Sequence, residues 1–201
     1  MPEQARTRLA RRAVVDAART LFLEQGYAST TVDAVSKLAD VPPATVYRLF
    51  GSKLAILKAM LDTSIAGDDE PVAVAARPDV AALFEERDPI ALLAGFAGVT
   101  AAINQRTNDV HRVLIGAAGS DPGAAELLAE VRDQRDRGQR QIVRALVRRK
   151  VLQRDLSARD AEDRVHALMS PEVYRLLIVD RRWSADRYRK WLATTLAQQL
   201  L

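Results

Sequence analysis

The sequence predicts an all-α protein, and its composition carries the prediction. Hydrophobic residues make up 48% of the 201 positions, which is enough to build a core and excludes a wholly disordered chain. Aromatic residues are only 5%. Ala, Leu, Arg, Glu and Gln, which are good helix formers, outnumber the β-branched residues. The length fits one or two domains.

Few residues capable of covalent or metal chemistry are present. The chain has no cysteine and only two histidines, His111 and His166, which excludes thiol catalysis, disulfide scaffolds and Cys-based zinc sites. There is no GxGxxG, Walker, HExxH or GxSxG motif. The acidic run Asp68–Glu70 lacks the spacing of a calcium loop and indicates a solvated linker. We therefore predict no catalytic residues, no metal and no cofactor.

No segment is suited to a membrane. The longest apolar run, Pro89 to Ile103, is shorter than the ~20 residues that span a bilayer. No apolar segment follows the N-terminal arginines, so no secretory signal is expected. We expect a cytoplasmic protein without a membrane partner.

The net positive charge comes from the N-terminal part. Residues 1–60 contain nine Lys or Arg and five Asp or Glu, and residues 61–201 contain 21 of each, so the whole net charge of +4 lies in the first 60 residues. A basic region joined to a neutral body is typical of a polyanion-binding module. A solvated, arginine-rich helix face is the alternative on charge alone.

The first 65 residues predict four helices. The first helix has one apolar stripe, which comprises Val14, Ala18, Leu21 and Phe22. Gly26 is the predicted C-terminal cap of this helix. Thr30 and Asp33 suggest a capping box at the start of the second helix. The residues expected to be buried in that helix are Val32, Val35, Leu38 and Ala39.

A tight turn and a short third helix follow. Asp40 tolerates a positive φ, and Pro43 suits the first turn of a helix that ends at Gly51. Ser52 is the predicted cap of a fourth helix that begins at Lys53. Two helices joined in this way form a helix-turn-helix layout.

The remaining chain predicts a helical bundle. An acidic break begins at Gly67, and we divide the chain into an N-terminal helix-turn-helix domain, 1–62, and a second helical domain, 63–201. The segment Pro89–Ile103 is apolar on nearly all faces and predicts a central, buried helix. Further helix starts are predicted at Asp121-Pro122, Ser157, Ser170-Pro171 and Ser184.

The third helix carries residues suited to DNA. At its N-terminal end Ala44, Thr45 and Arg48 can approach base edges in the major groove. Tyr47 and Lys53 can reach phosphates. The complete predicted contact set is Thr31, Lys37, Pro43, Ala44, Thr45, Tyr47, Arg48 and Lys53.

Residues 26–57 resemble the DNA-binding domain of the TetR family of transcriptional regulators. The matching positions, all in register, are Thr30, Thr31, Val41, Thr45, Tyr47, Phe50, Ser52 and Lys53. The chain departs from the family pattern in having Asp40 in place of Gly and Leu49 in place of His, and Pro42 leaves the recognition helix without an oxygen cap. The resemblance implies a ligand-responsive repressor that binds a palindromic operator in double-stranded DNA as a homodimer.

The resemblance also implies a dimer interface and an effector pocket in the second domain. Apolar stripes in the last helices suggest dimer contacts by Val173, Leu177, Tyr188, Leu192 and Leu196. Small residues along Pro89–Ile103 allow either close packing or a cavity, with candidate lining by Phe96, Ile103, His111 and Leu114. Because Pro89–Ile103 contains no charged residue, an apolar or weakly polar effector is expected. The alternative function is a helical small-molecule-binding protein or enzyme that uses the bundle.

Overall fold

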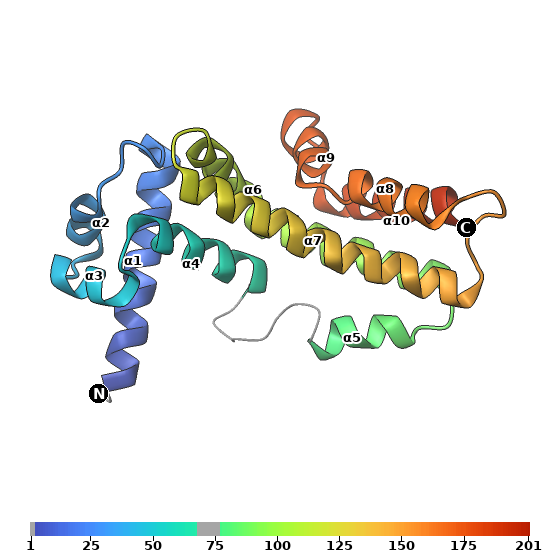
Figure 1. Ribbon diagram of the computed structural model, residues 1–201, viewed down its shortest axis with the longest axis horizontal. Helices are drawn as coiled ribbons and strands as arrows, with labels where there is room; N and C mark the ends of the chain where they lie inside the picture. Colours follow the sequence, from blue (N-terminus) through green and yellow to red (C-terminus); the bar gives the residue numbers. More distant parts are fainter. Residues whose placement is uncertain (1–2, 68–76) are drawn as a thin grey trace. The chain divides into compact units, whose positions relative to one another are not determined.

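The computed structural model describes residues 3–67 and 77–201, and in this part of the chain the regular structure is helical, without a strand (Figure 1). The predicted all-α fold is confirmed. The acidic residues Asp68–Glu70, predicted to be a solvated linker, lie outside the described residues. No helix among the described residues combines the length and the apolar character that a bilayer crossing requires.

The chain divides into two compact units. The first contains Met1–Asp68 and Asp109–Glu130, and the second contains Asp69–Asn108 and Val131–Leu201. The sequence prediction instead assigned all of residues 63–201 to one domain. The structure thus groups a segment from the middle of the chain with the N-terminal helices.

The first unit is built around four N-terminal helices, α1 (Glu3–Gln25), α2 (Val32–Ala39), α3 (Pro43–Phe50) and α4 (Lys53–Ala66). It also contains the end of α6 (Pro89–Ala118) and the start of α7 (Pro122–Arg149). The predicted apolar stripe of α1 is buried, since Val14 and Ala18 are fully inaccessible and Phe22 is 1% exposed. The four predicted helices are confirmed.

The start of α2 differs from the prediction by one residue. The side chain of Thr31, rather than Thr30, caps the helix by accepting a hydrogen bond from the Ala34 amide at 3.1 Å. Thr30 is buried, and its hydroxyl donates to the carbonyl of Gly26 at 2.9 Å. Asp33 therefore does not occupy the third helical position that a capping box requires.

The buried face of α2 also differs from the prediction. Leu38 is 52% exposed, whereas Ser36 is only 4% exposed. The Ser36 hydroxyl donates to the carbonyl of Val41, and this bond allows a polar residue to occupy a buried position in the turn. The prediction that Leu38 is a core residue is wrong.

The turn between α2 and α3 has the predicted geometry. Asp40 has φ 52° and ψ 41°, and its amide donates to carbonyls of the last turn of α2. Pro42 precedes α3 without a side-chain cap. Ser52 caps α4 by accepting from the amide of Ala55 at 3.1 Å.

The second unit contains the other parts of α6 and α7 together with the remaining helices. These are α5 (Pro78–Glu85), α8 (Ala158–Leu168), α9 (Pro171–Arg175), the π-helical turn η2 (Leu176–Asp180) and α10 (Ala185–Leu200). Ser157, Ser170 and Ser184 cap α8, α9 and α10 as predicted. Large core side chains include Leu92, Phe96, Leu146, Tyr188 and Leu192.

Two predictions for this unit need correction. Tyr188, Leu192 and Leu196 are fully buried within the single chain, so they belong to its own core and not to a surface that a second copy can contact. The first part of α6 is not buried on all faces, because Ile90 is 60% exposed while Leu92 and Leu93 are inaccessible. Apolar residues occur on every face of this helix, but not every face is buried.

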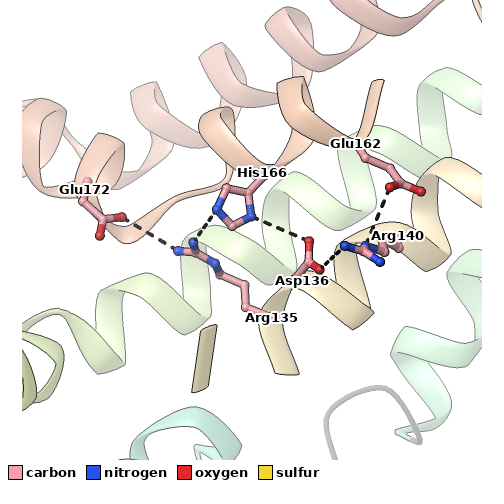
Figure 2. Close-up of polar contacts among 6 residues, drawn as sticks. All are labelled: Arg135, Asp136, Arg140, Glu162, His166 and Glu172. Carbon is pink, nitrogen blue, oxygen red and sulfur yellow. Dashed lines mark hydrogen bonds and ion pairs between the residues drawn. The ribbon is translucent and has the colours of Figure 1, made fainter. Parts of the chain in front are cut away.

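A polar network connects α7 to α8 and α9 in the second unit (Figure 2). Its members are Arg135, Asp136, Arg140, Glu162, His166 and Glu172. Nη2 of Arg135 lies 3.1 Å from Nε2 of His166, and because a guanidinium only donates, this imidazole nitrogen accepts. Arg140 lies 2.7 Å from Asp136 and 3.6 Å from Glu162. The network fixes three helices with side chains that remain partly exposed.

Two glycines with open space around them have opposite expected effects on stability. No heavy atom lies within 4 Å of a Cβ built at Gly26 or Gly138, but Gly26 has φ +83° whereas Gly138 lies within α7. Gly138→Ala is expected to raise the free energy of unfolding by about 0.5–1 kcal/mol, because alanine favours the helix. Gly26→Ala should lower it by about 1 kcal/mol, because an L-residue is strained there. Urea unfolding checks both; shifts of the same sign contradict the assignment.

Candidate nucleic-acid interface

The short helix α3, cyan in Figure 1, exposes most of the residues predicted to read bases. Pro43, Ala44 and Arg48 are exposed, and Thr45 is half-buried. Tyr47 is 51% exposed. Val46 is 1% exposed and anchors the opposite face in the core of the first unit. The sequence therefore places the small and polar residues of α3 on one accessible face.

The N-terminal end of α3 has no side-chain oxygen bound to it. The amides of Thr45 and Val46 donate to the Pro42 carbonyl at 2.9 and 3.1 Å, and Pro43 has no amide hydrogen. The partial positive charge of a helix N-terminus favours an anion. Without an oxygen cap, this end of α3 keeps its attraction for a phosphate.

Arg11 of α1 contacts the last turn of α3. Its Nη1 donates to the carbonyl of Leu49 at 2.8 Å, and its guanidinium carbon lies 4.5 Å from the centre of the Phe50 ring. The carbonyls of the last helical turn have no partner within the helix, so a cation here stabilises the helix end. Sequence reasoning missed this role because it treated the N-terminal arginines as one basic group.

The two predicted contact residues of α2 are both exposed. Thr31 uses its hydroxyl oxygen as the cap acceptor, which leaves the hydroxyl hydrogen as a donor. Lys37 lies in the last turn of α2. Their exposure is compatible with phosphate contacts, which stay predictions.

Lys53, also predicted to contact phosphate, has its ammonium group directed at the protein itself. Nζ donates to the carbonyls of Tyr27 at 2.8 Å, Thr30 at 2.9 Å and Ala28 at 3.5 Å. It also lies 4.2 Å from the centre of the Tyr27 ring. An ammonium has three N–H donors, so a phosphate contact has to replace one of these bonds.

The residues predicted to line an effector pocket fall into different units. Phe96 and Ile103 belong to the second unit, whereas His111 and Leu114 belong to the first. Sequence reasoning missed a set of buried polar residues on α6, each at most 9% exposed: Thr100, Asn104 and Thr107. Their spacing of four and three residues places them on one face of the helix, which was the available signal.

Comparison with known proteins agrees with this geometry. The family model described as bacterial regulatory proteins, tetR family, matches residues 14–60, which include α2, α3 and the turn between them. The uncharacterized HTH-type transcriptional regulator YdeS of Bacillus subtilis (strain 168) is 28% identical over 170 residues, which are 83% of this chain and 78% of the relative.

Two solved structures share the fold over nearly the whole chain. NalD of Pseudomonas aeruginosa, the secondary repressor of the MexAB-OprM multidrug efflux pump, superposes with a TM-score of 0.71 at 20% identity and 96% coverage of both chains. The fatty acid degradation regulator FadR of Bacillus halodurans superposes with a TM-score of 0.68 at 16% identity, covering 93% of this chain and 94% of that one. These findings favour the regulator over the enzyme that the sequence left open, and they confirm that the N-terminal helices resemble the DNA-binding domain of tetR-family bacterial regulatory proteins.

Proposed function

We propose that this protein is a cytoplasmic repressor that binds a palindromic operator as a homodimer and releases it when an uncharged small molecule binds. The observation that carries the proposal is the exposed face of α3, where Ala44, Tyr47 and Arg48 are accessible while Val46 anchors the helix. The role of NalD as a repressor supports repression as the direction of control.

Base reading is assigned to α3 and phosphate binding to its neighbours. The guanidinium of Arg48 can donate two hydrogen bonds to guanine, and Ala44 and Thr45 are small enough to let the helix enter the major groove. Thr31, Lys37 and Tyr47 are placed to donate to phosphates, which fix register without reading sequence. The net charge of +4 in residues 1–60 supplies the attraction.

A second copy supplies the specificity that one recognition helix lacks. A single short helix reads only a few base pairs, and two copies about one DNA turn apart read a palindrome. The chain exposes apolar side chains in and beside η2, where Leu176 is 52% and Val179 46% exposed. Val173 and Leu177 are only half-buried. We assign the dimer contact to this surface, residues 173–179.

Buried polar atoms in the second unit support a weakly polar effector. Oε1 of Gln139 is buried without a hydrogen-bond partner, and the buried amide of Asn104 and hydroxyl of Tyr188 lie close enough to interact with each other. Burial raises the pKa of Tyr188 to about 12, so its phenol is neutral at physiological pH. Unpaired buried polar atoms are costly, and a ligand with one or two hydrogen-bonding groups would satisfy them. Phe96 and Ile103 remain the candidate apolar lining.

Two substitutions separate base reading from phosphate binding. Arg48→Ala should weaken binding to the protein's own operator fragment by about 1–3 kcal/mol and relax specificity at one base position. Lys37→Ala should weaken binding to all sequences equally and reduce the slope of log K against log salt by about 0.9. Titrations by fluorescence anisotropy at several salt concentrations measure both. Lys190→Ala, on α10, is the control for the loss of one positive charge. Unchanged DNA affinity in both Arg48→Ala and Lys37→Ala would falsify the placement of these DNA contacts.

The dimer assignment is tested by molar mass in solution. Light scattering at micromolar concentration should give about twice the 22.2 kDa of one chain. Leu176→Glu should shift the protein towards the monomer, because a carboxylate is costly to bury between two copies. Leu9→Glu, at a similarly exposed leucine of α1, should leave the dimer intact. A monomeric wild-type protein sinks the assignment.

The effector site predicts a stabilising substitution. Gln139→Leu removes a buried amide oxygen that has no hydrogen-bond partner, so the free energy of unfolding should rise by about 1 kcal/mol. The matched control is Thr107→Val, because the hydroxyl of Thr107 donates to the Ile103 carbonyl at 2.9 Å and its removal should not stabilise the protein. Denaturant unfolding compares the two. If Gln139→Leu is the more destabilising, the amide serves the fold and not a ligand.

A further inference from the structure

A hydrogen bond connects the loop before α2 to the residue that precedes α7. The hydroxyl of Tyr27 donates to Oδ2 of Asp121 at 2.8 Å, between residues 94 positions apart in the sequence. Both residues belong to the first unit. Tyr27 is 6% exposed, whereas Asp121 is only half-buried.

Asp121 uses its two carboxylate oxygens for different partners. While Oδ2 accepts from Tyr27, Oδ1 accepts from the amides of Gly123 at 2.9 Å and Ala124 at 3.3 Å, in the first turn of α7. The Tyr27 hydroxyl and these amides hold the pKa of Asp121 below its usual value. The group is therefore a carboxylate at neutral pH, and hydrogen bonds to a charged acceptor are stronger than neutral ones.

Tyr27 also holds the loop Gly26–Thr31 in place through its backbone carbonyl and its ring. Its carbonyl accepts from Nζ of Lys53 at 2.8 Å and from the amide of Thr30 at 3.3 Å. Its ring centre lies 5.4 Å from that of Phe22. The loop ends at Thr31, which caps α2 and is a predicted phosphate contact. Tyr27 thus connects Asp121 to the loop that leads into α2.

A second contact brings α4 against the start of α7. A Cβ built at Gly123 would lie 2.6 Å from Cδ2 of Leu54, so α4 approaches the start of α7 as closely as a glycine allows. Nζ of Lys58 and Oε2 of Glu130 lie 3.1 Å apart, farther along the same two helices. The Tyr27–Asp121 bond is therefore part of a packed contact and not an isolated surface pair.

We propose that Tyr27 and Asp121 are positioning residues for DNA binding, whose hydrogen bond holds the loop Gly26–Thr31 where Thr31 and α2 can meet the phosphate backbone. The inference rests on the proposed function. Neither residue contacts DNA in this account. Without the bond, the loop is less ordered in the free protein, and DNA binding has to supply that ordering.

The test is Tyr27→Phe, which removes the hydroxyl and keeps the ring. Operator affinity should fall more than about twofold and up to about tenfold, the range of one net hydrogen bond. The slope of log K against log salt should stay at the wild-type value, because no phosphate contact is lost. Thr63→Val is the control for the loss of a hydroxyl, because the Thr63 hydroxyl donates to the carbonyl of Ala59 at 2.9 Å within its own helix, α4. Circular dichroism and urea unfolding verify that both variants are folded.

A second pair of variants keeps the test decisive if Tyr27→Phe is poorly folded. Asp121→Asn retains a capping oxygen and a polar group opposite Tyr27, so it should bind operator more tightly than Asp121→Ala does. Ser157→Ala, which removes the cap of α8, controls for the loss of a helix cap and should bind as the wild type does.

The outcomes separate the inference from the function on which it rests. A wild-type protein that binds no DNA fragment in a salt-dependent manner overturns the proposed function. A wild-type protein that binds, with Tyr27→Phe within twofold of it or no weaker than Thr63→Val, overturns the positioning role alone. A changed salt slope in Tyr27→Phe also overturns it, since that would make Tyr27 a phosphate contact.

Discussion

The helix that carries the predicted base-reading residues cannot be stable by itself. α3 has only eight residues, and an isolated helix of that length is marginal in water even with favourable side chains. Its accessible face therefore exists only because the rest of the first unit holds it. Val46 anchors it in the core, Asp40 permits the turn that precedes it, and Arg11 binds its last turn. Tertiary contact, rather than helix propensity, makes α3 available to DNA.

Because α3 depends on tertiary contacts, some basic residues in the first unit stabilise the fold. Counting charges indicates a polyanion-binding surface, but Arg11 and Lys53 direct their charged groups at carbonyls of their own backbone. Lys53 stabilises the loop that precedes α2, and Arg11 stabilises the C-terminal end of α3. Arg48 and Lys37 are exposed. Positive charge in this unit thus serves both to hold the reading helices and to attract DNA.

The features that the sequence predicted correctly are those that local side-chain chemistry determines. The positive φ of Asp40 and Gly26 and the serine caps at residues 52, 157, 170 and 184 follow from side-chain chemistry at single positions. Predictions that depended on distant partners did less well. Leu38 is exposed, and Tyr188, Leu192 and Leu196 face their own core, because an apolar stripe does not say which surface covers it. The Tyr27–Asp121 bond joins residues 94 apart and has no local signal.

The central claim, that a short helix held in place by its neighbours is what meets DNA, is tested most directly by amide hydrogen exchange in the free and DNA-bound protein. In the free protein the amides of Val46–Phe50 should exchange slowly, as those of the buried part of α1 do, because α3 opens only with the unit that holds it. On binding DNA, added protection should appear within residues 3–67. Rapid exchange of α3 in the free protein, or DNA-dependent protection confined to residues 77–201, would contradict the account.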